Sequence, residues 1–565
     1  MLQIRCKNNN ITKSFPEGSS LLDVYQGFAH ELKMQHPVVS ALVNNTTQGL
    51  KFRLYQNRDV EFLDAREPSG HRVYVRSLCF VLYKATQDLF PGSKLFIEHA
   101  ISRGFYCNFR PTANPSPREG RLITDEMLES IRQRMQEIIN LDMPFRRNEA
   151  TTEEAVRIFA ERGLSDKVKL LETSGQIYSD YYMLGDTADF YYGPLVPSAG
   201  YLKVWGLERY EQGLLLRVPD WHDPSRLAEK VDMPKTYEMF AEKTRWDIIM
   251  RLSNAGDVNK AILKGHASEL IQVSEALQEK KIVQIAEEIE RRFHQEENPV
   301  RIVLITGPSS SGKTTFCKRL SVQLLACGLR PYSVSTDDYF VNRTETPRLP
   351  NGDYDFDNIQ TVEYSLLEDH LGRLMKGERV EVPEYNFTTG KREWNGKKLK
   401  LSGDTVLIIE GIHALNPLLT KSIPETAKFK IYISALTSIS LDDHNWVPVR
   451  DNRLLRRIIR DYNKGAFTAQ ETISQWKNVC EAEDKWIFPF QETADVMFNS
   501  ALNIEFAVLR PHAEIILASV PKNCPEYTDA HRLLKFLHYF MPVSDKEIPP
   551  TSIMREFVGG SSFKY

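Results

Sequence analysis

The stretch RIVLITGPSSSGKTTFCKRLSVQLLA (residues 301–326) joins an apolar run, a turn rich in glycine and serine, and a segment of helical character. Its centre, residues 307–314, has the pattern GxxxxGK[ST]. Glycines at both ends of such a loop let backbone N–H groups turn inward and hold phosphate oxygens, and the N-terminus of the following helix favours negative charge. Because the pattern follows a predicted strand and opens a predicted helix at Lys313–Ala326, the sequence predicts a phosphate-binding loop.

The predicted loop defines a candidate site for ATP and Mg²⁺. We expect the side chain of Lys313 to reach the β- and γ-phosphates of ATP, and the Thr314 hydroxyl to bind Mg²⁺. The expected ATP-binding residues are Gly307, Ser309, Ser310, Ser311, Gly312, Lys313, Thr314 and Thr315.

Acidic residues follow two other predicted strands. Asp337 follows the run PYSVS (331–335), and Glu410 ends the run TVLIIE (405–410). Carboxylates at the carboxyl ends of strands in a doubly wound sheet lie in the ligand-binding crevice. Asp337 could there accept a proton from an attacking hydroxyl or hold the metal, although Asp also occurs in helix N-caps and solvated turns. Glu410 fits the Walker-B arrangement, in which the carboxylate holds Mg²⁺ directly or through water.

Four regions differ in sequence pattern, which indicates a multidomain α/β protein. Residues 1–64 contain short strand-like pieces around a helical stretch. Residues 65–225 mix helices with strands such as GYLKVWGL (200–207), and they contain the Pro-rich loop RPTANPSPREG (110–120). Residues 226–295 indicate a helical connector with a long amphipathic helix at 267–293. Residues 296–565 alternate helices with apolar runs, among them KIYIS (430–434) and EIILASV (514–520), that are typical of strands in a parallel sheet.

The composition excludes several classes of protein. Among 565 residues, 72 Lys and Arg against 75 Asp and Glu give a net charge of −3, so bulk charge does not indicate a polyanion-binding protein. No apolar run approaches the roughly 20 residues needed to span a bilayer, and the start MLQIRCKNNN lacks the pattern of a signal peptide. The seven cysteines are scattered without a CxxC pair, which favours reduced thiols. We therefore expect a cytoplasmic protein with no membrane contact.

Five motifs occur in the order and at the spacings seen in a known family. STDDYF (335–340), DYDFDN (353–358), PEYNF (383–387), LIIEGI (407–412) and RLLRRIIRDYNKG (453–465) resemble motifs of the uridine kinase and phosphoribulokinase family. The resemblance implies a P-loop kinase in which Asp337 is the catalytic base, Asp357 holds the sugar hydroxyls and Tyr385 lies beside the base. It also implies that Arg460 is a lid residue near the phosphates, whereas Arg456 and Arg457 could equally be exposed to solvent.

Two positions depart from the uridine kinase pattern. Where uridine kinases carry a His shortly after the aromatic residue, FTTGKR (387–392) has Gly390. Where they carry a second Arg after the lid glycine, KGAF (464–467) has Ala466. The first position takes part in base recognition and the second lies on the phosphate side. The identity of the substrate is therefore less certain than the class of reaction.

The N-terminal half resembles two modules of proteins that handle tRNA. PEGSSLLDVYQGF (16–28) and SALVNN (40–45) resemble the TGS domain, a ubiquitin-like β-grasp module. Residues 77–109 and 189–207 resemble the editing domain of threonyl-tRNA synthetase. That family uses an HxxxH and a CxxxH motif, but the matching positions here are Arg76, Phe80, Tyr191 and Leu195. None of these side chains can serve as the His/Cys set, so we expect neither zinc nor editing chemistry.

The domain order resembles long uridine kinase-like proteins of bacteria and supports three hypotheses. The first is an ATP- and Mg²⁺-dependent kinase that phosphorylates a hydroxyl of a small molecule, with a nucleoside as the expected acceptor. The second is an RNA- or tRNA-binding regulator whose nucleotide site acts as a switch. The third is a kinase of another hydroxyl compound, such as a sugar phosphate. A homo-oligomer stays open.

Overall fold

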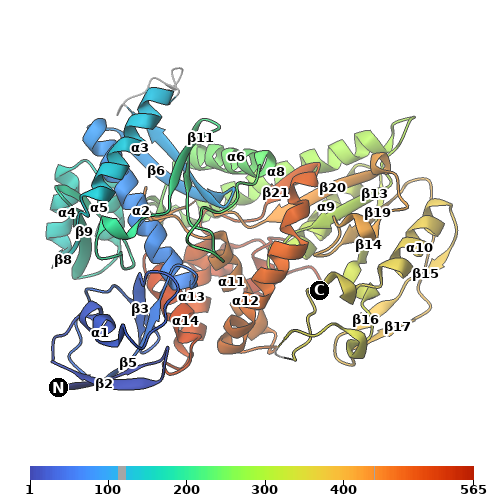
Figure 1. Ribbon diagram of the computed structural model, residues 1–565. Coiled ribbons are helices and arrows are strands. Elements are labelled where there is room, and N and C mark those ends of the chain that lie inside the picture. The colour runs from blue at the N-terminus through green and yellow to red at the C-terminus, as the bar shows by residue number, and fades with distance from the viewer. Residues whose placement is uncertain (112–122, 351, 438, 565) are drawn as a thin grey trace.

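The computed structural model describes residues 1–111, 123–350, 352–437 and 439–564. The Pro-rich loop expected at 110–120 lies almost entirely outside these ranges. In Figure 1 the N-terminal elements lie on the left, the parallel sheet lies on the right, and the C-terminal helices α13 (Glu505–Ala518) and α14 (Tyr527–Leu537) lie between them. Within the described ranges, no helix is both long enough and apolar enough to cross a membrane.

Residues 2–63 form a five-stranded sheet in the order β2-β1-β5-β3-β4. β1 pairs parallel with β5, and the other neighbours are antiparallel. The helix α1 packs on the sheet through buried apolar residues, and it begins after Ser20, whose hydroxyl accepts a hydrogen bond from the Asp23 N–H. The elements are β1 (Leu2–Cys6), β2 (Ile11–Phe15), α1 (Leu21–Phe28), β3 (Ser40–Val43), β4 (Thr46–Gln48) and β5 (Arg58–Leu63).

The next region is organised around α2 (Pro68–Leu89), which is buried along most of its length. Two antiparallel sheets, β11-β12-β7-β6 and β10-β9-β8, share a hydrophobic core with this helix. The elements are β6 (Lys94–Ile101), β7 (Gly104–Arg110), α3 (Asp125–Asn140), β8 (Phe145–Thr151), α4 (Thr152–Glu161), α5 (Ser165–Thr173), β9 (Tyr178–Leu184), β10 (Thr187–Asp189), β11 (Gly206–Tyr210) and β12 (Gly213–Arg217).

The strand expected at 200–207 is wrong for most of its length. Ala199–Tyr201 form a 3₁₀ turn, and strand structure begins only with β11 at Gly206. The Gly200 N–H donates a hydrogen bond to Asp142, so a side-chain contact to the end of α3 replaces a sheet partner. Alternating apolar residues alone could not reveal that contact.

Three helices follow: α6 (Pro234–Met250), α7 (Ala255–Leu263) and α8 (Ala267–Phe293). The helix expected at 267–293 is confirmed. These helices are part of the hydrophobic core of the parallel sheet as well as a connector. Buried residues of α8 pack with the first strand and helix of the sheet, and Phe240 of α6 packs on the opposite face of the sheet.

The C-terminal half contains a five-stranded sheet in the order β14-β19-β13-β20-β21, and each pair of neighbours is parallel. From β13 the chain first forms β14 and β19 on one side and then crosses to form β20 and β21 on the other, so the crevice at the carboxyl end of β13 is a topological switch point. The strands are β13 (Ile302–Thr306), β14 (Arg330–Ser335), β19 (Thr405–Glu410), β20 (Lys428–Ser434) and β21 (Val496–Asn499), and α9 (Lys313–Ala326) follows β13.

The fifth strand is therefore β21, and the strand expected at 514–520 is wrong. Residues 514–518 belong to α13, in which Ile516 and Leu517 are buried. An apolar run of this length is compatible with either a buried strand or a buried helix.

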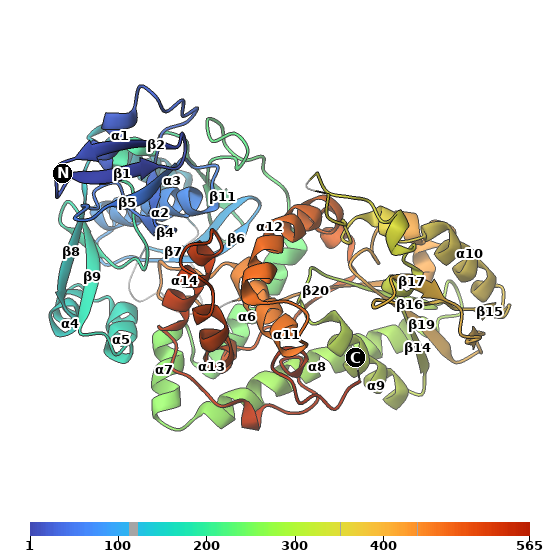
Figure 2. The same ribbon diagram turned by 90° about the horizontal axis from the view of Figure 1, so that it is seen from below.

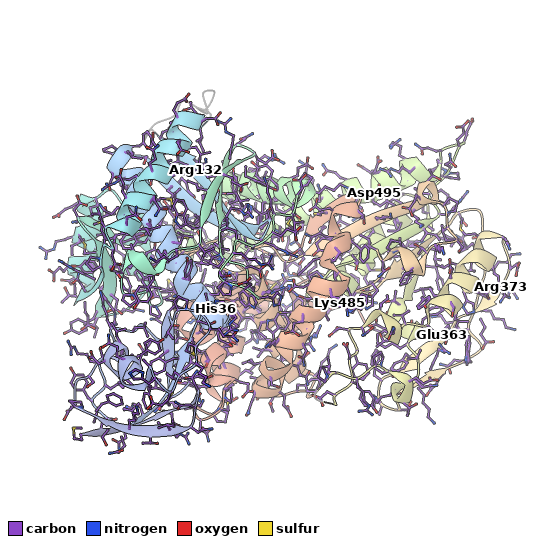
Figure 3. The ribbon with its side chains drawn as sticks, viewed as in Figure 1. His36, Arg132, Glu363, Arg373, Lys485 and Asp495 are labelled. Carbon is purple, nitrogen blue, oxygen red and sulfur yellow. The ribbon has the colours of Figure 1, made fainter. Side chains whose placement is uncertain are left out.

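A peripheral lobe and two central helices complete this half. The lobe contains α10 (Tyr364–Met375), β15 (Val380–Glu381), β16 (Glu384–Asn386), β17 (Lys391–Glu393) and β18 (Lys398–Leu399). The helices α11 (Val449–Asn463) and α12 (Ala469–Trp486) lie between this lobe and the N-terminal elements, as Lys485 between His36 and Arg373 indicates in Figure 3. The short helix α15 (Arg555–Val558) packs against α11, and Figures 1 and 2 both place the C-terminus near the middle of the molecule.

A buried ionic cluster joins the N-terminal and C-terminal halves. The Lys167 ammonium lies 3.0 Å from Asp189 and 3.0 Å from Asp442, and all three side chains are inaccessible to solvent. His444 contacts the other oxygen of Asp189 at 2.9 Å. The two halves are therefore packed together through matched charges.

Candidate active site

The loop after β13 has the backbone conformation that a phosphate cradle requires. Ser310 and Gly312 have positive φ values of 59° and 86°. A side chain at Gly307 would place Cβ 2.1 Å from the Ile433 carbonyl oxygen, so only glycine fits there. The contact at Gly307 ties the start of the GxxxxGK pattern to β20, a neighbouring strand of the same sheet.

Two of the predicted acids share the electrostatic environment of Lys313. Burial raises the pKa of Asp337 to about 6, and the Lys313 charge partly offsets this effect. Burial likewise raises the pKa of Glu410 to about 7, with Lys313 opposing the shift and the Asp337 charge adding to it. The structure therefore brings Lys313, Asp337 and Glu410 together beside the phosphate loop.

Asp357 belongs to the same group of carboxylates. Burial raises its pKa to about 6, Arg457 lowers it, and the charges of Glu483 and Asp337 raise it further. Next to it lies His413, whose pKa falls to about 4 because the ring is buried and because Lys313 is near. His413 is thus a neutral ring in the site. Sequence reasoning did not single it out, although it comes three residues after Glu410.

Tyr385 lies in an aromatic cluster at the edge of the site. Its ring contacts Phe340 and Phe387 with centroids 5.5 and 5.0 Å away. The Tyr385 hydroxyl is buried and has no hydrogen-bond partner among the described residues. An unsatisfied buried hydroxyl is costly, so this group is suited to a ligand.

The space above Gly390 is taken by Arg343. A side chain at Gly390 would place Cβ 2.8 Å from Arg343 Cβ and Nε, and the Arg343 N–H donates to the Gly390 carbonyl at 2.8 Å. Arg392, by contrast, pairs with Glu363, which is labelled in Figure 3. Arg343 therefore fills the space that a side chain at position 390 would need.

The arginine-rich helix α11 contacts the phosphate loop, but not through Arg460. The guanidinium of Arg453 donates to the Ser309 carbonyl at 3.0 Å, and Arg457 donates to the Ser309 hydroxyl at 3.1 Å. Arg456 reaches the Ser310 carbonyl at 3.3 Å. Arg460 pairs with Asp461 on its own helix at 3.1 Å.

Two of these arginines, Arg453 and Arg456, are buried and hold α11 in place. Arg453 is 1% exposed and Arg456 is 0% exposed, and each forms a buried ion pair, with Glu483 and Glu505 respectively. Because buried charges must be paired, these two pairs fix α11 against the loop. Arg457 is less buried, at 16% exposed, and it pairs with Asp461 of its own helix at 3.3 Å while it contacts the Ser309 hydroxyl.

Two carboxylates of the protein occupy positions on the phosphate loop. The Ser309 N–H donates to Glu483 at 2.9 Å. The Thr315 hydroxyl donates to Glu556 of α15 at 2.6 Å, and Ile553 packs so closely over Gly312 that an added Cβ would lie 2.4 Å from its Cγ2. The C-terminal segment therefore covers the loop that ATP is expected to contact.

The four positions of the expected editing set are apart from this site. Arg76, Tyr191 and Leu195 line a separate cavity, and Phe80 stacks on Tyr191 with ring centroids 5.5 Å apart. Within the described part of the chain, no group of three or more His, Cys, Asp and Glu side chains could hold a metal ion.

The strand order and the phosphate loop define a P-loop α/β domain, and known proteins are similar to this region. Residues 302–505 match the model of the Phosphoribulokinase / Uridine kinase family. A uridine kinase of Ureaplasma parvum is 26% identical over 196 residues, which are 34% of this chain and 86% of that protein. A solved structure titled as a possible uridine kinase from Bacillus stearothermophilus is 18% identical, covers 39% of this chain and 98% of its own, and has a TM-score of 0.27.

The N-terminal region matches a second kind of protein. A threonine–tRNA ligase of Syntrophomonas wolfei is 32% identical over 204 residues, which are 36% of this chain. The match covers 30% of that protein, so the chain spans about a third of the length of this relative. The chain thus combines a region that matches the model of the Phosphoribulokinase / Uridine kinase family with a region similar to threonine–tRNA ligases.

Proposed function

We propose that the protein is an ATP-dependent kinase that transfers the γ-phosphate to a hydroxyl of a nucleoside. The observation that carries this proposal is the convergence of Lys313, Asp337 and Glu410 at the carboxyl ends of three adjacent parallel strands. A positive charge for the phosphates and two recessed carboxylates beside it are the groups that phosphoryl transfer needs.

Asp337 is the proposed base. Its pKa of about 6 leaves it largely ionised at pH 7, yet close enough to that pH for efficient proton transfer. It would accept the proton of the attacking hydroxyl, while Lys313 stabilises the charge that develops on the phosphates. Arg457, which already touches the loop through Ser309, is the better placed arginine for the same task. Both Arg457 and Arg460 pair with Asp461, but only Arg457 also contacts the loop.

The acceptor is proposed to lie between Asp357 and Tyr385. The Asp357 carboxylate would accept hydrogen bonds from sugar hydroxyls, and the ring of Tyr385 offers an apolar face for a base. The unpaired Tyr385 hydroxyl and the buried Nε of Arg343 would supply polar contacts at the base edge. These features support a nucleoside over a smaller sugar phosphate.

The residues also fit Mg²⁺. Thr314 offers a hydroxyl, and Asp337 and Glu410 are oxygen ligands whose mutual repulsion a cation would relieve. When bound, Mg²⁺ would neutralise charge on the phosphates of ATP.

The test is transfer of ³²P from γ-labelled ATP to a panel of nucleosides, with Lys313→Ala as the inactive variant and Lys376→Ala, an exposed lysine outside the site, as its control. We expect a labelled nucleoside monophosphate from the wild type and the control, and none from Lys313→Ala. Transfer by Lys313→Ala at the wild-type rate would show that the loop is not the ATP site. A product that forms equally from ribose alone would favour a non-nucleoside acceptor.

The similarity to threonine–tRNA ligases keeps the nucleotide-switch hypothesis in view. The same assay with added tRNA separates the nucleotide-switch hypothesis from the kinase hypothesis. A switch protein would hydrolyse ATP in a tRNA-dependent manner and label no nucleoside.

A further inference from the structure

A large cavity lies where three parts of the chain meet, far from the phosphate loop in sequence. It has a volume of about 670 Å³ and is lined by the β4 loop, α2, β8, β9, the segment 191–197 and α14. Cavities of this size hold ligands as large as a nucleotide. Because the C-terminal helix α14 supplies one wall, the cavity exists only in the complete protein.

The lining is strongly basic. Seven Lys and Arg side chains face it, against two acids, Glu149 and Asp180. The basic residues come from all three parts of the chain: Lys51, Arg72, Arg76, Arg146, Arg147, Arg532 and Lys535. A protein with a net charge of −3 has no general excess of positive charge that would produce such a cluster by chance.

Some of these basic side chains have no carboxylate partner. Arg76 is only 6% exposed, donates to the Pro194 carbonyl at 3.0 Å and lies over the Tyr192 ring at 5.2 Å, but it has no ion-pair partner among the described residues. Lys535 likewise has no ion-pair partner within the described ranges, although its side chain is exposed; burial of its ammonium group lowers its pKa, Asp180 opposes this shift, and Arg147 and Arg76 add to it. An unpaired buried cation is costly to fold unless an anion balances it.

The other arginines are held in place. Arg532 forms ion pairs with Asp451 and Asp529, at 2.9 Å in each case, and Arg147 pairs with Asp180 at 2.6 Å. Their carboxylate partners fix the guanidinium groups around the space rather than filling it. Preorganised arginine clusters of this kind bind phosphate through charge-assisted, bidentate hydrogen bonds.

We propose that this cavity binds a phosphate-bearing small molecule of nucleotide size, held by the unpaired cations Arg76 and Lys535. The tyrosine rings beside Arg76, Tyr182 and Tyr192, offer a surface for the organic part of the ligand. The site binds and does not hydrolyse, because its lining contains no metal-ligating set and no paired nucleophile and base. Arg76 stands at a position where the editing family has a histidine, so the substitution changes a catalytic position into an anion-binding one.

The test is calorimetric titration of the full-length Lys313→Ala protein, in which the proposed ATP site is disabled. The probes are inorganic pyrophosphate and uridine 5′-monophosphate, with uridine as the uncharged control. We expect both anions to bind at the cavity, whereas any binding of uridine at the proposed acceptor site should be unchanged by substitutions in the cavity. Lys535→Gln, added to the same background, should weaken binding roughly ten- to a hundredfold, since one charged hydrogen bond is lost.

Two further variants make the result unambiguous. Arg76→Gln should have the same effect as Lys535→Gln, whereas Lys264→Gln, an exposed lysine in the helical region, should leave binding unchanged. Because Lys535 is at the cavity surface, its variant folds even if Arg76→Gln does not. Anion binding that neither Arg76→Gln nor Lys535→Gln weakens would overturn the proposal. So would tight binding of tRNA that both variants abolish, if pyrophosphate and the nucleotide do not bind at all.

The proposal does not depend on the proposed kinase activity. Its readout is binding in a protein that lacks Lys313, so a chain without kinase activity could still bind the anion, and an active kinase could fail to bind it.

Discussion

The carboxylate of Glu556 lies 2.6 Å from the hydroxyl of Thr315, in the first turn of the helix that follows the phosphate loop. The two residues are 241 positions apart in sequence, and the contact places a negative charge where an ATP phosphate is expected. We therefore expect the C-terminal segment to compete with nucleotide for the same groups, and we expect ATP to displace this carboxylate when it binds.

Glu556→Gln should therefore strengthen nucleotide binding. The amide keeps the size of the side chain and loses the charge that repels phosphate, so we expect the Kd for ADP to fall roughly three- to tenfold, in line with a charged hydrogen bond at a partly exposed site. Calorimetric titration measures this, with Glu547→Gln, on an exposed 3₁₀ turn of the same segment, as the control. Weaker binding by Glu556→Gln would mean that the carboxylate supports the loop rather than competing with ATP.

Asp337→Asn should reduce turnover by about 10²–10⁴-fold while changing nucleotide affinity much less, because the amide cannot accept the proton of the hydroxyl. In the wild type, kcat/KM should rise as the pH increases through about 6, where Asp337 becomes ionised. Steady-state kinetics between pH 5 and pH 8 check both statements. An equal collapse of ATP binding would point to Asp337 as a metal ligand only.

The same substitution should stabilise the fold at high pH. The pKa of Asp337 is raised from 3.8 to about 6 in the folded protein, so the folded state binds the proton more tightly than the unfolded state. The cost of the buried charge is absent below about pH 4, grows as the pH rises through the folded pKa, and is fully present at pH 8. Asp337→Asn should gain roughly 1–3 kcal/mol at pH 8 and little at pH 4.5. Urea unfolding at the two pH values, without Mg²⁺ or nucleotide, is the measurement, and an equal gain at both would exclude the ionisation effect.

Nucleoside selectivity should depend on Arg343 and not on Asp357. With Gly390 in place of a histidine, we expect either broad nucleoside acceptance or low activity on uridine. Asp357→Ala should lower kcat/KM for uridine, cytidine, adenosine, guanosine and inosine alike, because the ribose is common to all of them. Arg343→Ala should change the ratios among these substrates. A wild-type enzyme that prefers uridine roughly 10³-fold over all others would contradict the relaxed pocket.

The N-terminal half should neither hydrolyse mischarged tRNA nor hold zinc. The positions Arg76, Phe80, Tyr191 and Leu195 supply no His or Cys ligand. Elemental analysis of the full-length protein, together with a deacylation assay on mischarged threonine tRNA, tests this. One tightly held zinc per chain would contradict it.

The sequence predicted the centre of the site because its signals are local. The helices at Lys313–Ala326 and Ala267–Phe293 and four of the five parallel strands are confirmed, since each has a pattern that a short window can show. The roles of Asp337, Asp357, Tyr385 and Glu410 stay predictions, although the structure places these residues around the loop.

The features that the sequence did not predict depend on contacts between segments far apart in the chain. The run 514–520 is helical because α13 packs on α11 and α14, and no local signal separates this from a strand. Of the two arginines that the sequence allowed to be exposed, Arg456 is buried because Glu505 meets it from another helix, and Arg457 is 16% exposed. The cover over Gly312 by Ile553 likewise joins two ends of the domain.

The pairing of Lys167 with Asp189 and Asp442 has a consequence for how such a protein can evolve. Two domains that meet through a solvent-exposed surface, where water and salt screen the charges, can be exchanged between genes with little loss of stability. Here a recombinant that replaced the N-terminal half would leave Asp442 without Lys167 in a place that water does not reach, at a cost of several kcal/mol. Replacing the C-terminal half would cost less, because Lys167 keeps Asp166 and Asp189 of its own half. We therefore expect the intact chain to unfold in a single cooperative transition instead of one step for each half.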